Sequence, residues 1–103
     1  MNKTAQEVAA YIRAIVKREV GAIRSFRKLS EDYHWYTSAG RKNAWRYKYY
    51  LPDMDAENMD RLMDAYKLIN GMAPKLKEMF GYTVVANFSR KGHSLIYRVT
   101  PIN

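Results

Sequence analysis

The alternation of side chains over residues 45–51 constrains the fold of this chain more than any other feature. Apolar rings and cations take turns there, in the order Trp45, Arg46, Tyr47, Lys48, Tyr49, Tyr50 and Leu51. A period of two predicts a strand with one face on a core and the other face presenting cations. Pro52 ends this strand, because proline cannot donate to a β-ladder. The turn-like residues 38–43 precede it, so we expect a β-hairpin over Tyr33–Leu51.

A second hairpin is predicted near the C-terminus. Residues 82–88 and residues 95–100 are rich in the β-branched and aromatic side chains that favour strands. The segment 89–93 between them reads Ser-Arg-Lys-Gly-His, which is typical of a turn and carries basic residues at its tip.

Three helices are predicted around these hairpins. Thr4 and Glu7 have the spacing of a capping box, and apolar residues then recur at helical spacing, so we expect a first helix over residues 5–29. A second helix is predicted over Asp55–Asn70, with carboxylates at its positive end. Gly71 is a good helix terminator, and Pro74 suits the first turn of a short third helix, Pro74–Phe80.

This order of elements is similar to that of a winged-helix domain, in which a helix pair joined by a tight turn is followed by a hairpin, the wing. The likeness is carried by Asp55–Asn70, the joint Gly71-Met72-Ala73, Pro74–Phe80, and the hairpin 82–100 with Arg90, Lys91 and His93 at its tip. The alternative is a plain α+β layer, with two long helices on one face of a three- or four-stranded antiparallel sheet. Both arrangements are α+β folds, and the length of 103 residues predicts a single domain over 1–103.

The net charge of +8 is distributed unevenly along the chain. Residues 1–30 carry a net charge of +5, residues 31–52 carry +2, residues 53–73 carry −3, and residues 74–103 carry +4. Three basic regions around one acidic helix predict a polarised surface, which would attract an anionic partner. The plain alternative is a charge that only keeps the protein soluble.

Cations interleaved with aromatic rings favour nucleic-acid binding, because lysine and arginine neutralise phosphates and rings stack on unpaired bases. The cations expected to contact phosphates are Arg13, Lys17, Arg24 and Lys28 in the first helix, Arg41, Lys42, Arg46 and Lys48 in the first hairpin, and Arg90 and Lys91 in the second turn. The rings expected to stack on bases are Trp35, Tyr36 and Tyr50. We therefore predict a non-enzymatic nucleic-acid-binding domain, with DNA slightly preferred over RNA. This hypothesis requires the cations to gather on one side of the molecule.

A second hypothesis is a protein-binding accessory or inhibitor protein of phage or plasmid type, acting on an acidic patch of a host protein. Its support is the group of methionines in the predicted helix pair, at positions 54, 59, 63, 72 and 79. Methionine fills irregular cores and also adapts to partner surfaces. A homodimer through the first helix is compatible with either hypothesis.

The residue types argue against catalysis and against metal or cofactor binding. The chain has no cysteine, which excludes disulfides, thiolate zinc sites and a cysteine nucleophile. His34 and His93 fall in separate hairpins, and neither has a carboxylate–serine pattern nearby. The run Asp53-x-Asp55-x-Glu57 imitates the start of a calcium loop, but its sixth position is Asn58 where such a loop needs glycine.

The distribution of apolar residues predicts a cytoplasmic protein without a membrane span. No apolar run approaches the ~20 residues that a spanning helix needs. The N-terminal residues lead into an amphipathic helix, and they lack the apolar core of a signal peptide.

Overall fold

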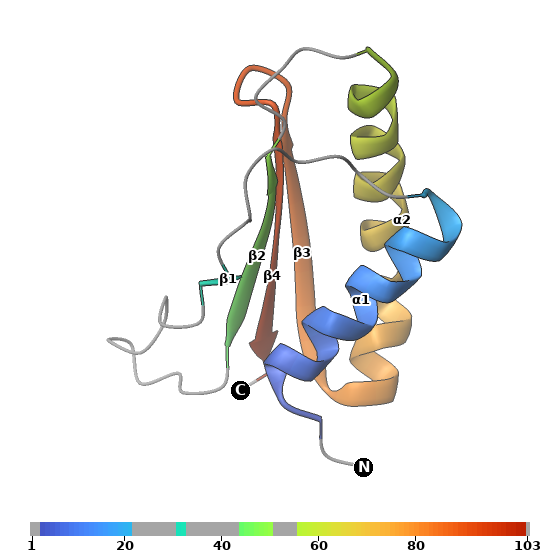
Figure 1. Cartoon of the computed structure of the whole chain (residues 1–103). Helices are drawn as coiled ribbons and strands as arrows, with labels where there is room; N and C mark the ends of the chain where they lie inside the picture. The colour runs from blue at the N-terminus through green and yellow to red at the C-terminus, as the bar shows by residue number, and fades with distance from the viewer. Residues whose placement is uncertain (1–2, 22–30, 33–43, 51–55, 103) are drawn as a thin grey trace.

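Two helices and an antiparallel sheet form two layers (Figure 1). The computed structural model describes residues 3–21, 31–32, 44–50 and 56–102. The elements are α1 (Ala5–Glu19), β1 (Glu31–Asp32), β2 (Trp45–Tyr50), α2 (Ala56–Phe80), β3 (Tyr82–Ser89) and β4 (Ser94–Pro101). Both helices lie on the same face of the sheet, with α2 against β3 and α1 crossing beside it. The predicted α+β class is confirmed, in the form of the layered alternative.

The sheet has the strand order β1-β2-β4-β3, and every neighbouring pair is antiparallel. The predicted C-terminal hairpin is confirmed, because β3 and β4 pair from Tyr82 with Pro101 to Ser89 with Ser94. The predicted strand over 45–51 is confirmed for residues 45–50 as β2. The short strand β1 pairs with β2 only at Tyr47 and Arg46. The predicted hairpin turn 38–43 lies outside the described residues.

Helix α1 begins as predicted but ends earlier than predicted. The Thr4 hydroxyl accepts a hydrogen bond from the Glu7 N–H at 3.2 Å, and the Thr4 N–H donates to the Glu7 carboxylate at 2.8 Å. This is the capping box, and the bond from Thr4 lowers the pKa of Glu7. The predicted extension to residue 29 is wrong, because Gly21 adopts a φ of 104° and its N–H closes the helix end on the Lys17 carbonyl at 3.2 Å. Gly21 is therefore a C-terminal cap and not a loose interior residue.

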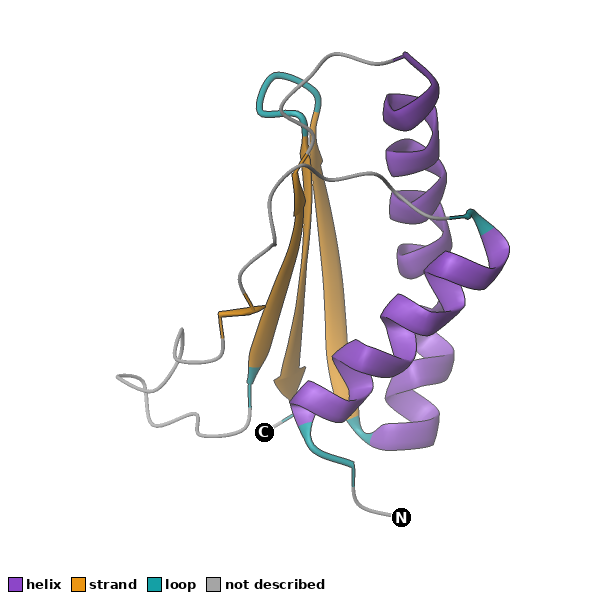
Figure 2. Cartoon of the chain, in the orientation of Figure 1, coloured by secondary structure: helices purple, strands orange, loops and turns teal. Residues whose placement is uncertain are grey.

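Helix α2 is a single helix where the sequence predicts a helix, a turn and a short helix (Figure 2). Gly71 and Pro74 both lie inside it, although they cost about 1 and 3 kcal/mol in a helix interior. The buried stripe explains the continuity, because Ile69 before the predicted turn and Leu76 after it are both buried in the same core. The predicted joint at 71–73 is wrong, and the helix pair on which the winged-helix likeness depended is absent from the described residues.

The core lies between the sheet and the two helices. Alternate residues of β2, β3 and β4 face this layer, and they include Tyr49 of β2, Val84 of β3 and Tyr97 of β4. Tyr97 is fully buried, and its hydroxyl donates a 2.8 Å hydrogen bond to the Ala9 carbonyl of α1. This bond satisfies the buried hydroxyl and joins the sheet to the first helix.

Asn70 of α2 binds the outer edge of β3. Its side-chain amide donates to the Ala86 carbonyl at 3.4 Å, and its carbonyl oxygen accepts from the Ala86 N–H at 3.2 Å. The outer N–H and C=O groups of an edge strand lack ladder partners, so one side chain here replaces a neighbouring strand at this position. The contact also holds β3 and α2 in register.

The Asn70→Asp substitution should lower the free energy of unfolding by about 1–2 kcal/mol. It replaces the amide donor with a second acceptor, so the bond to the Ala86 carbonyl is lost and two oxygens face each other. Urea unfolding measures the change. Asn87→Asp is the matched control, because it makes the same change at an exposed position of β3 and should stay within ~0.5 kcal/mol of the parent. Equal losses in the two variants would contradict a specific contact.

Candidate nucleic-acid interface

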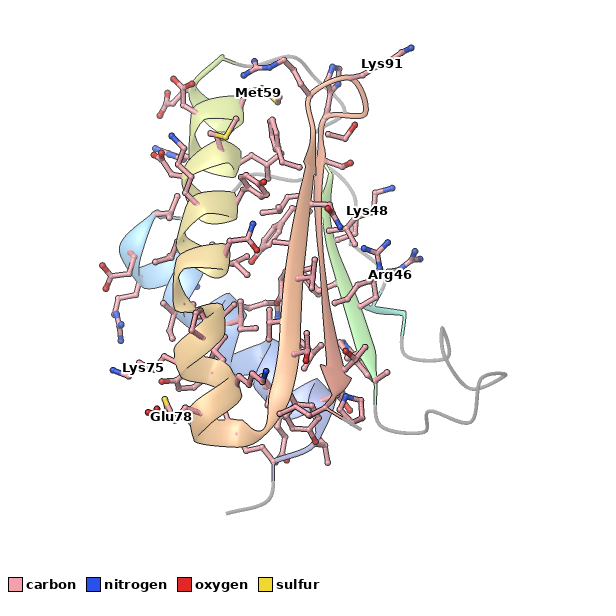
Figure 3. The ribbon with its side chains drawn as sticks, turned by 180° about the vertical axis from the view of Figure 1, so that it is seen from behind. Arg46, Lys48, Met59, Lys75, Glu78 and Lys91 are labelled. Atoms are coloured by element: carbon pink, nitrogen blue, oxygen red, sulfur yellow. The ribbon has the colours of Figure 1, made fainter. Side chains whose placement is uncertain are left out.

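The face of the sheet opposite the helices carries a mixed polar surface, which we call the open face. Within the described residues no helix lies on it (Figure 1). Strand alternation places on it the side chains of Arg46, Lys48, Thr83, Val85, Asn87, Ile96, Arg98 and Thr100. Arg46 and Lys48 project from β2 on the side away from both helices (Figure 3).

Three cations gather on the open face. Arg46 of β2 and Arg98 of β4 are register partners, so their Cβ atoms lie about 5 Å apart on one face. Lys48 is two residues along β2 and is therefore about 7 Å from Arg46. The β3 side of the same face holds only uncharged residues, with Val85 opposite Arg98 and Asn87 opposite Ile96. The open face is therefore cationic along β2 and β4 and neutral along β3.

The pairing of two arginines has an electrostatic cost. Like charges directly opposite each other on neighbouring strands destabilise a sheet. In the register, Asp32 of β1 takes the position on the other side of Arg46. An anion that bridged Arg46 and Arg98 would be attracted by both side chains.

The β3–β4 turn adds one more cation beyond the end of the open face. Lys91 lies at the tip of the turn, and Lys48 and Arg46 follow at increasing distance from it (Figure 3). Arg90 is directed elsewhere, because its guanidinium lies 5.8 Å from the centre of the Phe88 ring, on the helix-facing side of β3. Of the two basic residues predicted at this turn, only Lys91 extends the row of cations.

Arg13 does not point outward from α1 as predicted. Its guanidinium lies 4.7 Å from the centre of the Tyr47 ring, between α1 and the sheet. The Tyr47 ring contacts those of Tyr49 and Tyr97 at centroid distances of 5.0 and 5.6 Å. Arg13 thus covers a cluster of tyrosines with its charge and its apolar stem, and it is absent from any phosphate-binding stripe.

Two hydroxyls of the same tyrosine cluster have raised pKa values. Burial, and secondarily the neighbouring Tyr47, raises the pKa of Tyr49 well above its ordinary value. Burial raises the pKa of Tyr97 as well, with a further contribution from Tyr49, and Arg13 opposes both shifts. These two hydroxyls are therefore strongly held in the neutral form.

The remaining predicted contacts do not join the open face. Lys17 is exposed on α1, which covers the opposite face of the sheet. We expected the cations of the first helix and of the hairpin to form one surface. This is wrong for the described residues, because Lys17 belongs to the helical layer while Arg46 and Lys48 lie on the open face. Outside the described residues lie Arg24, Lys28, Arg41, Lys42, Trp35 and Tyr36. The backbone of Tyr50 pairs with Ser94, and its side chain is outside the described part.

Arg98 is a cation of the open face that the sequence did not lead us to include among the phosphate contacts. Apolar Leu95, Tyr97 and Val99 alternate with Ile96, Arg98 and Thr100, which is the same signal that located Arg46 and Lys48. Its pairing with Arg46 was not predictable, because the register of β2 against β4 joins segments far apart in the chain.

The described residues contain neither a metal-binding cluster nor a helix that could span a membrane. No three histidine, cysteine, aspartate or glutamate side chains lie close enough together in this part of the chain to hold a metal ion. Neither described helix contains a stretch long and apolar enough to cross a bilayer.

Comparison of the chain with protein families, with curated proteins and with solved structures found no match.

Proposed function

We propose that this protein binds nucleic acid through the open face, with Arg46, Lys48 and Arg98 contacting phosphates and Lys91 adding a contact at the turn. The observation that supports the proposal is the direct pairing of Arg46 with Arg98 on adjacent strands, with Lys48 beside them. The arrangement concentrates three cations on two neighbouring strands of one face.

The shape of the surface favours an extended polyanion over a small anion. A small anion needs converging donors in a concave site, whereas Arg46 and Lys48 lie about 7 Å apart along β2 and Lys91 lies farther along the same direction, at the turn. The neutral β3 side of the open face, with Val85 and Asn87, can contact sugars or bases beside the phosphates. The proposal includes the cytoplasmic location expected from the sequence. It assigns no sequence specificity and no catalytic step.

Binding to nucleic acid should weaken steeply with salt. Contacts from Arg46, Lys48, Arg98 and Lys91 would release about four counterions, which gives a slope of log K against log salt of about −3 for a single strand. Fluorescence anisotropy of labelled random-sequence single-stranded DNA, RNA and duplex DNA measures it between about 50 and 200 mM salt.

The affinities for the three probes show which polymer is preferred. The slope of log K against log salt tests whether the cations contact phosphates. A weak affinity with a flat salt response for all three probes would overturn the proposal. The second sequence-based hypothesis, an acidic patch of a host protein as the partner, would then take its place.

A further inference from the structure

A hollow between α1 and α2 opens on the side of the molecule opposite the open face. It encloses about 210 Å³. Its apolar lining comes from both helices: Tyr11, Ile15, Met72, Leu76 and Met79. Leu76 is buried at its floor, while Tyr11 and Met79 leave 36% and 44% of their surface exposed. Four large apolar side chains are exposed among the described residues, and two of them meet here.

This concentration of exposed apolar surface is continuous with the core below it. The Tyr11 ring packs edge-on against Phe80 at a centroid distance of 5.2 Å, so the rim of the hollow is an ordered aromatic contact. Methionine side chains adapt their shape to apolar partners, and tyrosine is enriched at the centres of protein interfaces. The lining therefore offers an apolar contact to a partner whose side chains fit the hollow.

The charges at the hollow are both positive. Arg18 of α1 and Lys75 of α2 are its two ionisable lining residues besides Tyr11. Arg18 bonds Glu19 at 3.0 Å through Nε only, and its side chain is 71% exposed, which leaves the outer guanidinium edge toward solvent. Lys75 and Glu78 project from the outer side of α2 (Figure 3), and Glu78 is not part of the lining. Besides the apolar contact, the lining offers Lys75 and the outer edge of the Arg18 guanidinium, which favour a ligand that carries carboxylates.

We propose that this hollow binds an acidic amphipathic helix of a partner protein. A groove between two helices with an apolar floor accepts the apolar stripe of a third helix, with anchors at positions i, i+3 or i+4 and i+7. Arg18 and Lys75 stand on different helices, so they can meet carboxylates on either side of that stripe. The site is independent of nucleic-acid binding, because the sheet separates it from the open face.

A designed peptide pair tests the proposal by NMR. The probe is a helix of about 18 residues, above the ~12–15 that isolated helices need, with leucine on one stripe and glutamate elsewhere. Its counterpart carries lysine in place of glutamate. With ¹³C-methyl methionine labelling, the glutamate peptide should shift the Met72 and Met79 signals. Met59 is buried at the other end of α2 (Figure 3) and is the internal control, so its signal should stay in place.

Charge reversal of the rim should exchange the preference between the two peptides. In the parent, the glutamate peptide should bind about tenfold more tightly than the lysine peptide, and in Arg18→Glu/Lys75→Glu the order should invert. Lys17→Glu/Lys67→Glu makes the same change of net charge on the same two helices outside the lining and should keep the parent order. An unchanged Met59 signal shows that each variant is folded.

Two results would overturn the proposal. One is a glutamate peptide that leaves the Met72 and Met79 methyl signals unmoved. The other is a rim reversal that leaves the order of the two peptides as in the parent.

Discussion

Replacing Arg46 and Arg98 together by glutamate should weaken nucleic-acid binding about 100-fold at ~0.1 M salt. Each phosphate contact multiplies non-specific affinity by about five- to eightfold at that ionic strength, and two acids in place of two cations add repulsion. The salt slope should become shallower by about 1.5, since two counterions fewer are released. Anisotropy titration of the single-stranded and duplex probes measures both quantities. Because Arg46 pairs in the register with Asp32 of β1, the substitution also changes a charge pair within the sheet, so urea unfolding is used to show that the variant is folded.

The control separates this surface from net charge. Lys17→Glu/Lys67→Glu changes the net charge by the same amount on the helical layer, on the far side of the sheet. It should cost less than about tenfold, through the general field of the protein. If the two double variants lose the same affinity, the open face is not the binding surface, and the helix cations of the original hypothesis would regain support.

Stability should fall steeply once the pH rises above about 10. Tyr49 and Tyr97 have pKa values raised above those of the unfolded chain, mainly by burial. Between the unfolded value near 10 and the folded value, the unfolded state has lost protons that the folded state retains, so a rise in pH favours unfolding. Each tyrosine that is ionised in the unfolded chain and neutral in the folded protein contributes a slope of at most about 1.4 kcal/mol per pH unit.

Urea unfolding followed by circular dichroism between about pH 9 and 12 measures that slope. Tyr97→Phe removes one of the two titrating groups and should halve the slope, at the smaller cost of the hydrogen bond to Ala9. Tyr11→Phe removes an exposed hydroxyl and should keep the full slope. If Tyr97→Phe and Tyr11→Phe show the same slope, the buried tyrosines do not cause the loss of stability at high pH.

The parts of the fold that the sequence predicted are those that depend on local patterns. The capping box of Thr4 and Glu7, the alternation in β2 and the hairpin of β3 and β4 each involve residues close together in the chain. Gly21 and Gly71 show where such reasoning fails. The same residue type ends a helix at Gly21 and lies inside one at Gly71, where Ile69 and Leu76 pack on the core on both sides of the glycine.

The candidate site divides in the same way. Arg46 and Lys48 were predictable as outward-facing cations, because a strand presents alternate residues on one face. Arg13 was not, since a helical stripe of cations reads as solvent-facing until an aromatic partner from another element is known. Tyr47, which attracts Arg13, comes from β2 and meets α1 only in the folded protein.

Sequence alone was enough to determine an α+β chain with a strand at residues 45–50, a C-terminal hairpin and a capped first helix, because propensity and periodicity act over a few neighbouring residues. Tertiary packing decided that both helices cover one face of the sheet, that α2 runs unbroken through Pro74, and that Arg46 meets Arg98. These outcomes depend on strand register and on burial between distant segments, and neither is encoded in any single stretch of the chain.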